Sequence, residues 1–281
     1  MAEHSLRYSQ LGKFLAQHDI ALYALDLRGH GFTAHFGTLG HFSDLNGWQS
    51  TLEDIRCLNH HIRQQHPNTP IFILGHSLGS FLTIDYLLQY SCGIQGAILS
   101  GSNYIQSTWK YQLATQLARF ERWRLGPQGK SKLLDWLIFN SYRRSFKPRQ
   151  TDFDWLNSDS YAVKRYVQDP LCGFMCTTGL WLDVLTGLQR ITPINHLLQV
   201  DNLLPIFIFG GEYDPINKGH RLLDLADAFR KAGNRHVDVK LYSGMRHEPL
   251  QETQSERVMF DVLSWIKQHQ HARITEKSQQ N

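Results

Sequence analysis

The sequence lacks any run of about eighteen apolar residues, the length that a membrane-spanning helix needs. Its first ten residues, MAEHSLRYSQ, also lack the apolar stretch of a signal peptide. From these two absences we expect a cytoplasmic protein without a transmembrane segment, whose only membrane contact would be peripheral, at the inner face.

Cysteine is scarce, and neither sign of charge dominates. The chain has four cysteines in 281 residues, and none forms a C-x-x-C pair. Cys172 and Cys176 also lack the neighbouring His or Cys that a zinc site requires. We therefore expect reduced thiols, no metal and no cofactor. The net charge of +4 is spread along the chain, which predicts no nucleic-acid partner.

Two kinds of apolar pattern alternate along the chain. Short β-rich runs favour strands, and longer amphipathic stretches favour helices. This alternation predicts an α/β fold with a mainly parallel sheet flanked by helices. The expected strands are 20–26, 70–77, 96–100, 204–210 and 236–242, and the expected helices are 6–18, 45–65, 78–89, 219–231 and 254–271.

The alternation of strand and helix patterns stops between residues 103 and 195, where no strand pattern occurs and amphipathic helical segments follow one another. We interpret 103–195 as a helical cap inserted into a core that consists of 1–102 and 196–271. Residues 272–281 form a polar tail.

The pentapeptide GHSLG, residues 75–79, lies directly between a predicted strand and a predicted helix. This is the context of a G-x-S-x-G nucleophile elbow, in which a strained turn projects the serine hydroxyl above the sheet edge. Because a serine hydroxyl is a weak nucleophile, Ser77 needs a base, and the base needs an acid to orient it.

Candidates for both partners follow Ser77 in the order serine, acid, histidine. Asp214 comes after the strand that ends near residue 210, and His247 comes after the strand that ends near 242. Glu212 and Asp201 compete with Asp214 as the acid. We prefer Asp214 and keep Glu212 in reserve, because Glu212 lies closer to the strand end and Asp201 precedes the strand.

Two cap segments bear on the substrate. Residues 109–124 place Trp109, Leu113, Leu117 and Phe120 on one helical face, which we interpret as packed on the core rather than as a membrane-binding face. Residues 132–140, KLLDWLIFN, are expected to line an acyl channel. The cluster of Arg143, Arg144, Lys147 and Arg149 could attract a lipid phosphate, but such clusters are usually solvated, so the head group stays open.

These motifs together resemble those of a known family. The segments AEHSLRY, YALDLRGHG, GHSLG, TDFDWL, DPLCGF, YDPIN and YSGMRHE are similar to those of the α/β-hydrolase branch that contains bacterial lysophospholipases and monoacylglycerol lipases, also grouped as serine aminopeptidase-like hydrolases. The resemblance implies Ser77 as nucleophile, Asp214 as acid, His247 as base and a mobile cap over an acyl pocket. It further implies the amides of Leu78 and Met1 as oxyanion donors.

One departure from the family concerns the amino end. Family members have three further strands and a His-Gly pair before the position of Met1, so we expect the first strands of the fold to be missing and the true start to lie upstream. The expected function is hydrolysis of a fatty acyl ester, either a lysophospholipid or a monoacylglycerol, through an acyl-enzyme. The alternatives are an aminopeptidase-like hydrolase for small residues and an inactive fragment or lipid-binding scaffold.

Overall fold

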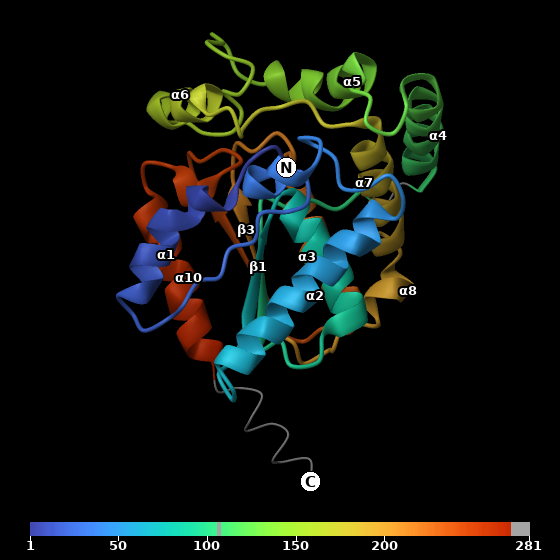
Figure 1. Ribbon diagram of the computed structural model, residues 1–281. Coiled ribbons are helices and arrows are strands. Elements are labelled where there is room, and N and C mark those ends of the chain that lie inside the picture. Colours follow the sequence, from blue (N-terminus) through green and yellow to red (C-terminus); the bar gives the residue numbers. More distant parts are fainter. Residues whose placement is uncertain (106–107, 271–281) are drawn as a thin grey trace.

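The computed structural model describes residues 1–105 and 108–270, and within these ranges a single parallel sheet has four strands in the order β1-β2-β3-β4 (Figure 1). The strands are β1 (Phe72–His76), β2 (Gly96–Ser100), β3 (Ile206–Gly211) and β4 (Val237–Tyr242). Every residue of β2 and β3 is buried, as expected for central strands covered on both faces. The predicted α/β fold class is confirmed.

Helices cover both faces of the sheet. On one face, α2 (Gly47–Gln65), α3 (Leu78–Tyr90) and α9 (Arg221–Lys231) pack around buried strand residues such as Leu99 and Ile208. On the other face, α1 (Ser9–Ala16) and α10 (Ser255–His269) pack around Ile98 and Phe209. All five expected helices are therefore present, with bounds that differ by a few residues.

The segment 103–195, which we propose to be the cap, contains further helices over the carboxyl ends of the strands. Figure 1 shows α4 (Thr108–Leu125), α5 (Lys132–Arg143) and α6 (Ser160–Gln168) above the sheet, while α7 (Thr178–Ile191) runs down beside α3 and leads into α8 (Ile194–Leu197). Short 3₁₀ turns, η1 (Ser5–Tyr8), η2 (Gly31–Phe36) and η3 (Pro249–Gln251), lie in the core segments.

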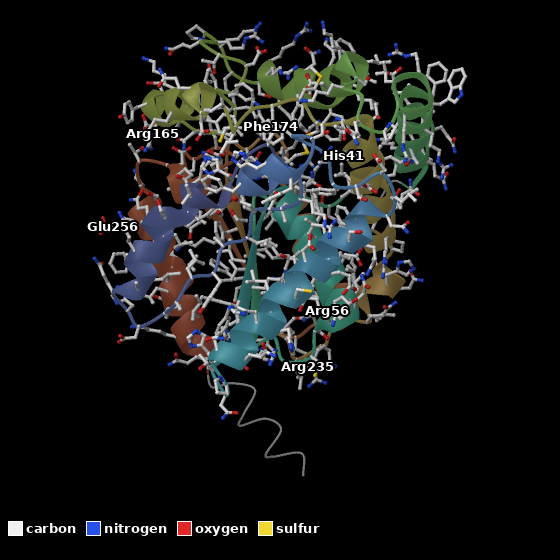
Figure 2. The ribbon with its side chains drawn as sticks, in the orientation of Figure 1. His41, Arg56, Arg165, Phe174, Arg235 and Glu256 are labelled. Atoms are coloured by element: carbon white, nitrogen blue, oxygen red, sulfur yellow. The ribbon has the colours of Figure 1, made fainter. Side chains whose placement is uncertain are left out.

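The cap and core also meet through single side chains. Figure 2 labels His41 and Phe174 in this region. The His41 ring lies 3.0 Å from the Thr177 hydroxyl, and the Phe174 ring packs edge-on against His30 with centroids 5.3 Å apart. These contacts attach the segment that leads into α7 to the core.

The prediction of a strand at residues 20–26 is wrong. All of these residues are described, and none of them joins the sheet, which ends at β1. An extended segment becomes a strand only by pairing its backbone groups with a neighbour, and here no strand lies beside it. Ala21, Leu22, Tyr23 and Ala24 are consequently exposed.

The packed face predicted for residues 109–124 is also wrong for three of its four members. Trp109, Leu113 and Phe120 are 63%, 65% and 53% exposed. The helix instead buries Tyr111, Thr115 and Ala118 on the side where it packs against α7, and Gln189 of α7 donates to the Thr115 hydroxyl at 2.6 Å. Among the described helices, none has the length and apolar content needed to cross a bilayer. His271 and the expected tail 272–281 lie outside the described residues.

Candidate active site

Ser77 occupies the sharp turn between β1 and α3. Its backbone has φ 51° and ψ −116°, a region that non-glycine residues rarely adopt. The turn is possible because Gly75 has no side chain: a Cβ there would lie 2.3 Å from the carbonyl oxygen of Gly79. The sequence therefore forces the Ser77 side chain out of the sheet and towards the cap.

The predicted acid and base lie together. Asp214 follows β3, and its Oδ2 is 2.9 Å from Nδ1 of His247, which follows β4. Both side chains are almost fully buried, and the Ile216 amide donates to the other Asp214 oxygen at 2.9 Å. Glu212 is exposed and accepts from the Ser243 hydroxyl at 2.8 Å, so the geometry favours Asp214.

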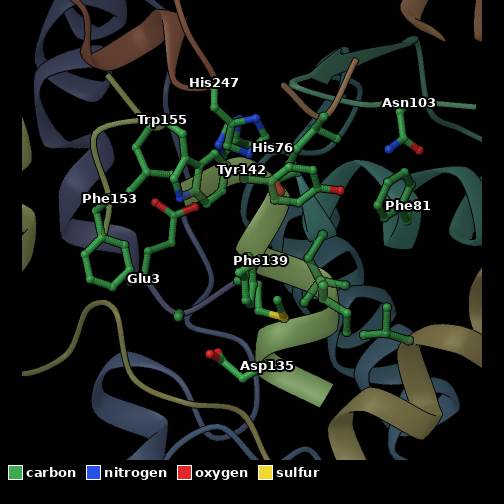
Figure 3. Close-up of a pocket in the computed structure, with 18 of the residues that line it drawn as sticks. Glu3, His76, Phe81, Asn103, Asp135, Phe139, Tyr142, Phe153, Trp155 and His247 are labelled. Atoms are coloured by element: carbon green, nitrogen blue, oxygen red, sulfur yellow. The ribbon is translucent and has the colours of Figure 1, made fainter. Parts of the chain in front are cut away.

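Two aromatic side chains flank the His247 imidazole (Figure 3). The His76 ring centroid lies 4.8 Å away, and that of Trp155 lies 5.1 Å away. Burial, together with the neighbouring His247, lowers the pKa of His76 to about 3, so His76 is neutral. Our sequence reasoning missed both neighbours. The position of His76 inside the elbow could have indicated it, whereas no pattern indicated Trp155.

Both predicted oxyanion residues lie at the same cavity as Ser77. Leu78 is the first residue of α3, where a backbone N–H has no acceptor within the helix. Met1 lines the cavity from the amino-terminal segment. Positive N–H groups at the start of a helix stabilise a developing negative charge.

The cavity above Ser77 has a volume of about 240 Å³ and is lined mainly by aromatic and aliphatic side chains. Ile138 and Phe139 line it as predicted for residues 132–140, whereas Leu133, Trp136 and Leu137 of the same helix are exposed. Residues of α3 and α7 also line the cavity. Its other apolar lining residues include Phe81, Ile105, Tyr111, Tyr142, Phe153, Leu156, Trp181, Val184, Leu185 and Leu188.

Charged groups occupy one end of the cavity. Arg7 forms a bidentate ion pair with Glu248, at 2.7 Å for each bond, and a third bond of 2.7 Å to Glu3. Burial, the largest single effect, raises the pKa of Glu3, but the Arg7 cation together with further neighbours, among them the Tyr8 hydroxyl, outweighs it and lowers the pKa to about 2. This cluster links the amino-terminal segment to the residue that follows His247.

A second cation at the cavity is also paired. Arg143 lies 2.7 Å from Asp135 and 3.8 Å from Asp152. Arg149 lies 3.3 Å from the other oxygen of Asp152. Two of the four basic residues considered for phosphate binding are therefore neutralised by carboxylates of the cap itself.

One group of described residues has the donor types of a metal site. His4, Asp169 and Cys172 place one ligand atom each within 4.8 Å of one another. However, His4 Nε2 already lies 2.8 Å from Asp169, and burial raises the pKa of the Cys172 thiol to about 12. We interpret the group as a contact between the amino-terminal segment and the cap.

Comparison with known proteins agrees with this geometry. Residues 1–254 match the family model described as serine aminopeptidase, S33. The chain is 24% identical to a monoacylglycerol lipase of Mycolicibacterium smegmatis over 271 residues, covering 95% of this chain and 85% of that protein. It is 22% identical to the monoglyceride lipase of Rattus norvegicus, with 94% and 78% covered.

Solved structures show the same fold. A thermostable carboxyl esterase from Bacillus coagulans has a TM-score of 0.89 at 23% identity, covering 96% of this chain and 87% of that one. The monoacylglycerol lipase of Paleococcus ferrophilus has a TM-score of 0.70 at 21% identity, with 96% and 91% covered.

Proposed function

Because this chain belongs to the serine aminopeptidase S33 family of α/β-hydrolases, we propose that it cleaves monoacylglycerols with Ser77, Asp214 and His247. The reaction class, carboxylic ester hydrolysis, is that of the named lipases and esterases to which the chain is similar. The observation that carries the proposal is the buried Asp214–His247 pair, whose histidine lines the same apolar cavity as a serine in an elbow.

In the proposed mechanism, His247 removes the Ser77 proton as the hydroxyl oxygen attacks the ester carbonyl. The backbone N–H of Leu78, with the backbone nitrogen of Met1, donates to the resulting oxyanion. Asp214 holds the tautomer in which Nδ1 of His247 carries a proton, and it stabilises the imidazolium that forms. His247 then protonates the departing glycerol, and water releases the fatty acid from Ser77 by the reverse sequence.

The charge pattern favours a neutral head group over a phosphate. Arg143 lines the cavity, Arg7 binds two of its lining carboxylates, and each of these two cations is paired with two carboxylates. A phosphate would have to displace one of these carboxylates from its cation, which leaves a partly buried charge without a partner. Glycerol hydroxyls need no such exchange.

A comparison of the hydrolysis rates of two substrates tests this proposal. Purified protein is supplied with mono-oleoylglycerol or with oleoyl-lysophosphatidylcholine, and fatty acid release is measured for the wild type and for Ser77→Ala. We expect release from the monoacylglycerol at least about tenfold faster, a difference of roughly 1.4 kcal/mol in activation free energy, and none with Ser77→Ala. Faster release from the lysophospholipid would overturn the head-group proposal.

A second reaction has one observation in its favour. Cleavage of a small amino-terminal residue needs an acidic group to bind the substrate ammonium, and both Glu3 and Glu248 line the cavity. Arg7 already pairs with both carboxylates, which weakens this alternative. Measurable hydrolysis of alanine p-nitroanilide, lost in Glu3→Gln, would support it.

The cap surface leads us to propose peripheral contact with an anionic membrane. Trp109, Leu113, Phe120 and Trp123 are all more than half exposed along α4. Leu133, Trp136 and Leu137 of α5 add further exposed apolar area. Basic side chains lie between them, and this combination is typical of helices that bind the membrane interface. The basic residues of α4 are Lys110, Arg119, Arg122 and Arg124.

Vesicle co-sedimentation tests the membrane contact. The double variant Phe120→Ala and Trp123→Ala is compared with Phe260→Ala, which removes a similarly exposed aromatic ring from α10, away from the cap. We expect the α4 variant to bind anionic phosphatidylglycerol vesicles several-fold more weakly and the α10 variant to bind like the wild type. Equal binding by all three proteins would contradict the proposal that the α4 surface contacts the membrane.

A further inference from the structure

The structure assigns a role to Trp155: we propose that it is a positioning residue that holds the imidazole of His247 in the orientation needed to reach Ser77. This inference rests on the proposed function of the site. It concerns a cap residue that makes no ion pair and has no place in the Ser77, Asp214 and His247 arrangement itself.

The first observation is that the His247 ring is enclosed on two sides. Trp155 lies against it with a centroid distance of 5.1 Å and an interplanar angle of 38°. His76 lies 4.8 Å away at 48°. Trp155 is only 6% exposed and is itself held by α5, since its ring stacks on Phe139 at 6.1 Å and contacts Tyr142 at 5.4 Å.

The second observation is that the backbone beside Trp155 is tied to the loop that carries His247. The Glu248 amide donates to the Leu156 carbonyl at 2.9 Å, so the two residues next in sequence to Trp155 and His247 are hydrogen-bonded. The Asn157 side chain donates to the Gln251 carbonyl at 2.9 Å. Residues 154–158 and 246–252 therefore form one connected unit.

Further contacts at both ends strengthen this unit. The Ser158 amide donates to Glu252 at 2.9 Å, and the same carboxylate oxygen accepts from the Arg246 amide at 2.9 Å. The Arg246 guanidinium donates to the Asn157 carbonyl at 3.0 Å and also to the carbonyl of Asp154. Every residue from 154 to 158 except Trp155 thus contacts the loop by a hydrogen bond, and Trp155 contributes its ring.

These contacts give Trp155 a specific effect on the reaction. Asp214 fixes one edge of the imidazole through Nδ1, but a single hydrogen bond leaves the ring free to tilt about that bond. The two flanking rings remove this freedom, because tilting would drive the imidazole into the indole or into His76. Misplacement of a reacting group by about 1 Å can cost about 100-fold in rate.

The test compares Trp155→Leu, Trp155→Phe and Tyr161→Leu, using p-nitrophenyl acetate because its short acyl group does not need the acyl wall of the cavity. Tyr161 is the control, since it is another aromatic residue between 103 and 195, lies on α6 and is 66% exposed. We expect kcat to fall about 10- to 100-fold in Trp155→Leu, with KM nearly unchanged, to recover largely in Trp155→Phe, and to be normal in Tyr161→Leu.

A second readout separates positioning from folding. The low-field ¹H NMR signal of the Nδ1 proton between His247 and Asp214 should broaden or disappear in Trp155→Leu at a temperature where the protein remains folded. If Trp155→Leu does not fold, Ser158→Ala provides a second variant, because it removes the hydrogen bond that the Ser158 hydroxyl donates to Glu252 and should also lower kcat. A wild-type kcat in the variant that folds overturns the inference. A wild-type protein that neither hydrolyses the ester nor reacts with a fluorophosphonate overturns the proposed function instead.

Discussion

Two carboxyl groups, Glu212 and Asp214, follow the end of β3 and are separated by one residue. Their surroundings are nevertheless very different. Asp214 is 1% exposed and faces His247, whereas Glu212 is exposed and accepts from Ser243. In an extended chain the two side chains would lie on the same side, but residues 212–213 form a turn, and this turn separates the two carboxyl groups. That turn is fixed by the Asp214 amide bonding back to Gly211 at 3.2 Å.

Substitution of each carboxyl group gives the first prediction. Asp214→Asn keeps the size of the side chain but can hold the wrong tautomer of His247, so we expect kcat on a soluble ester to fall by about 10⁴-fold. Glu212→Gln should leave kcat within about twofold of the wild type, since substitutions away from a site have small effects. A larger loss in Glu212→Gln than in Asp214→Asn would move the role of the acid to Glu212.

At the scale of residues, the sequence alone predicts those site residues that lie in recognisable local motifs. Ser77, Asp214 and His247 each follow a strand, and parallel strands bring their carboxyl ends to one edge. Trp155 and Arg7 could not be found in this way. Their contacts with His247 and Glu248 join residues about 90 and 240 positions apart in the chain, which no local periodicity encodes.

At the scale of elements, helix α2 shows how cap and core are coupled. Asn46, which precedes α2, has a left-handed backbone and its side chain does not cap the helix. The Asp183 carboxyl of α7 instead lies against the backbone of Gly47 and Trp48, so a helix of the cap segment places an acidic group at the N-terminus of a core helix, where the helix dipole favours negative charge.

This contact predicts a pH dependence of stability. Burial raises the pKa of Asp183 from 3.8 to about 6, although the two backbone donors oppose the shift. As the pH rises from about 4 to about 6, the unfolded chain releases this proton while the folded protein retains it. Asp183 therefore lowers the stability of the folded state across that window, and its contribution is constant at higher pH.

The variant Asp183→Asn isolates this effect, because the amide oxygen can still accept from the helix and cannot ionise. We expect the Tm of Asp183→Asn, relative to that of the wild type, to increase between pH 4 and pH 7 in thermal unfolding. The exposed Asp19→Asn serves as the control and should show little change. A Tm difference that is flat with pH, or that decreases, would contradict the assignment.

The errors at the element scale have a common cause. Residues 20–26 have the composition of a strand, and residues 109–120 have the apolar face of a packed helix. The local sequence pattern identifies which residues can pair in a sheet or pack in a core. Whether a partner lies beside them depends on the tertiary structure, which the local pattern does not encode. The first segment has no neighbouring strand, and α4 turns its large apolar side chains outward while Tyr111 and Ala118 face α7.

For the whole molecule, the sheet is covered by helices on both faces and has an open edge at β1. β2 and β3 lie between two apolar clusters, one with α2, α3 and α9 and the other with α1 and α10. β1 pairs with β2 alone, and most of its residues are only partly buried. We therefore expect stability to be concentrated in the centre of the sheet and to be lower near residues 20–27.

Hydrogen exchange measures this distribution directly. Amides of β2 and β3 are buried in the ladder and should exchange only on global unfolding, whereas the amides of 21–27, outside the ladder, should exchange orders of magnitude faster. Mass spectrometry of peptic fragments resolves the two regions. Protection of 21–27 equal to that of β2 would mean that this segment pairs with another strand in solution.

The central claim is that Ser77 is an activated nucleophile, and one measurement addresses it most directly. Folded protein is incubated with a fluorophosphonate probe, and the labelled residue is located by mass spectrometry, with Ser77→Ala and heat-denatured wild type as controls. The account predicts labelling at Ser77 alone, absent from both controls, with Asp214→Asn labelled much more slowly. A folded wild-type protein that takes up no probe, or takes it up at another serine, would contradict it.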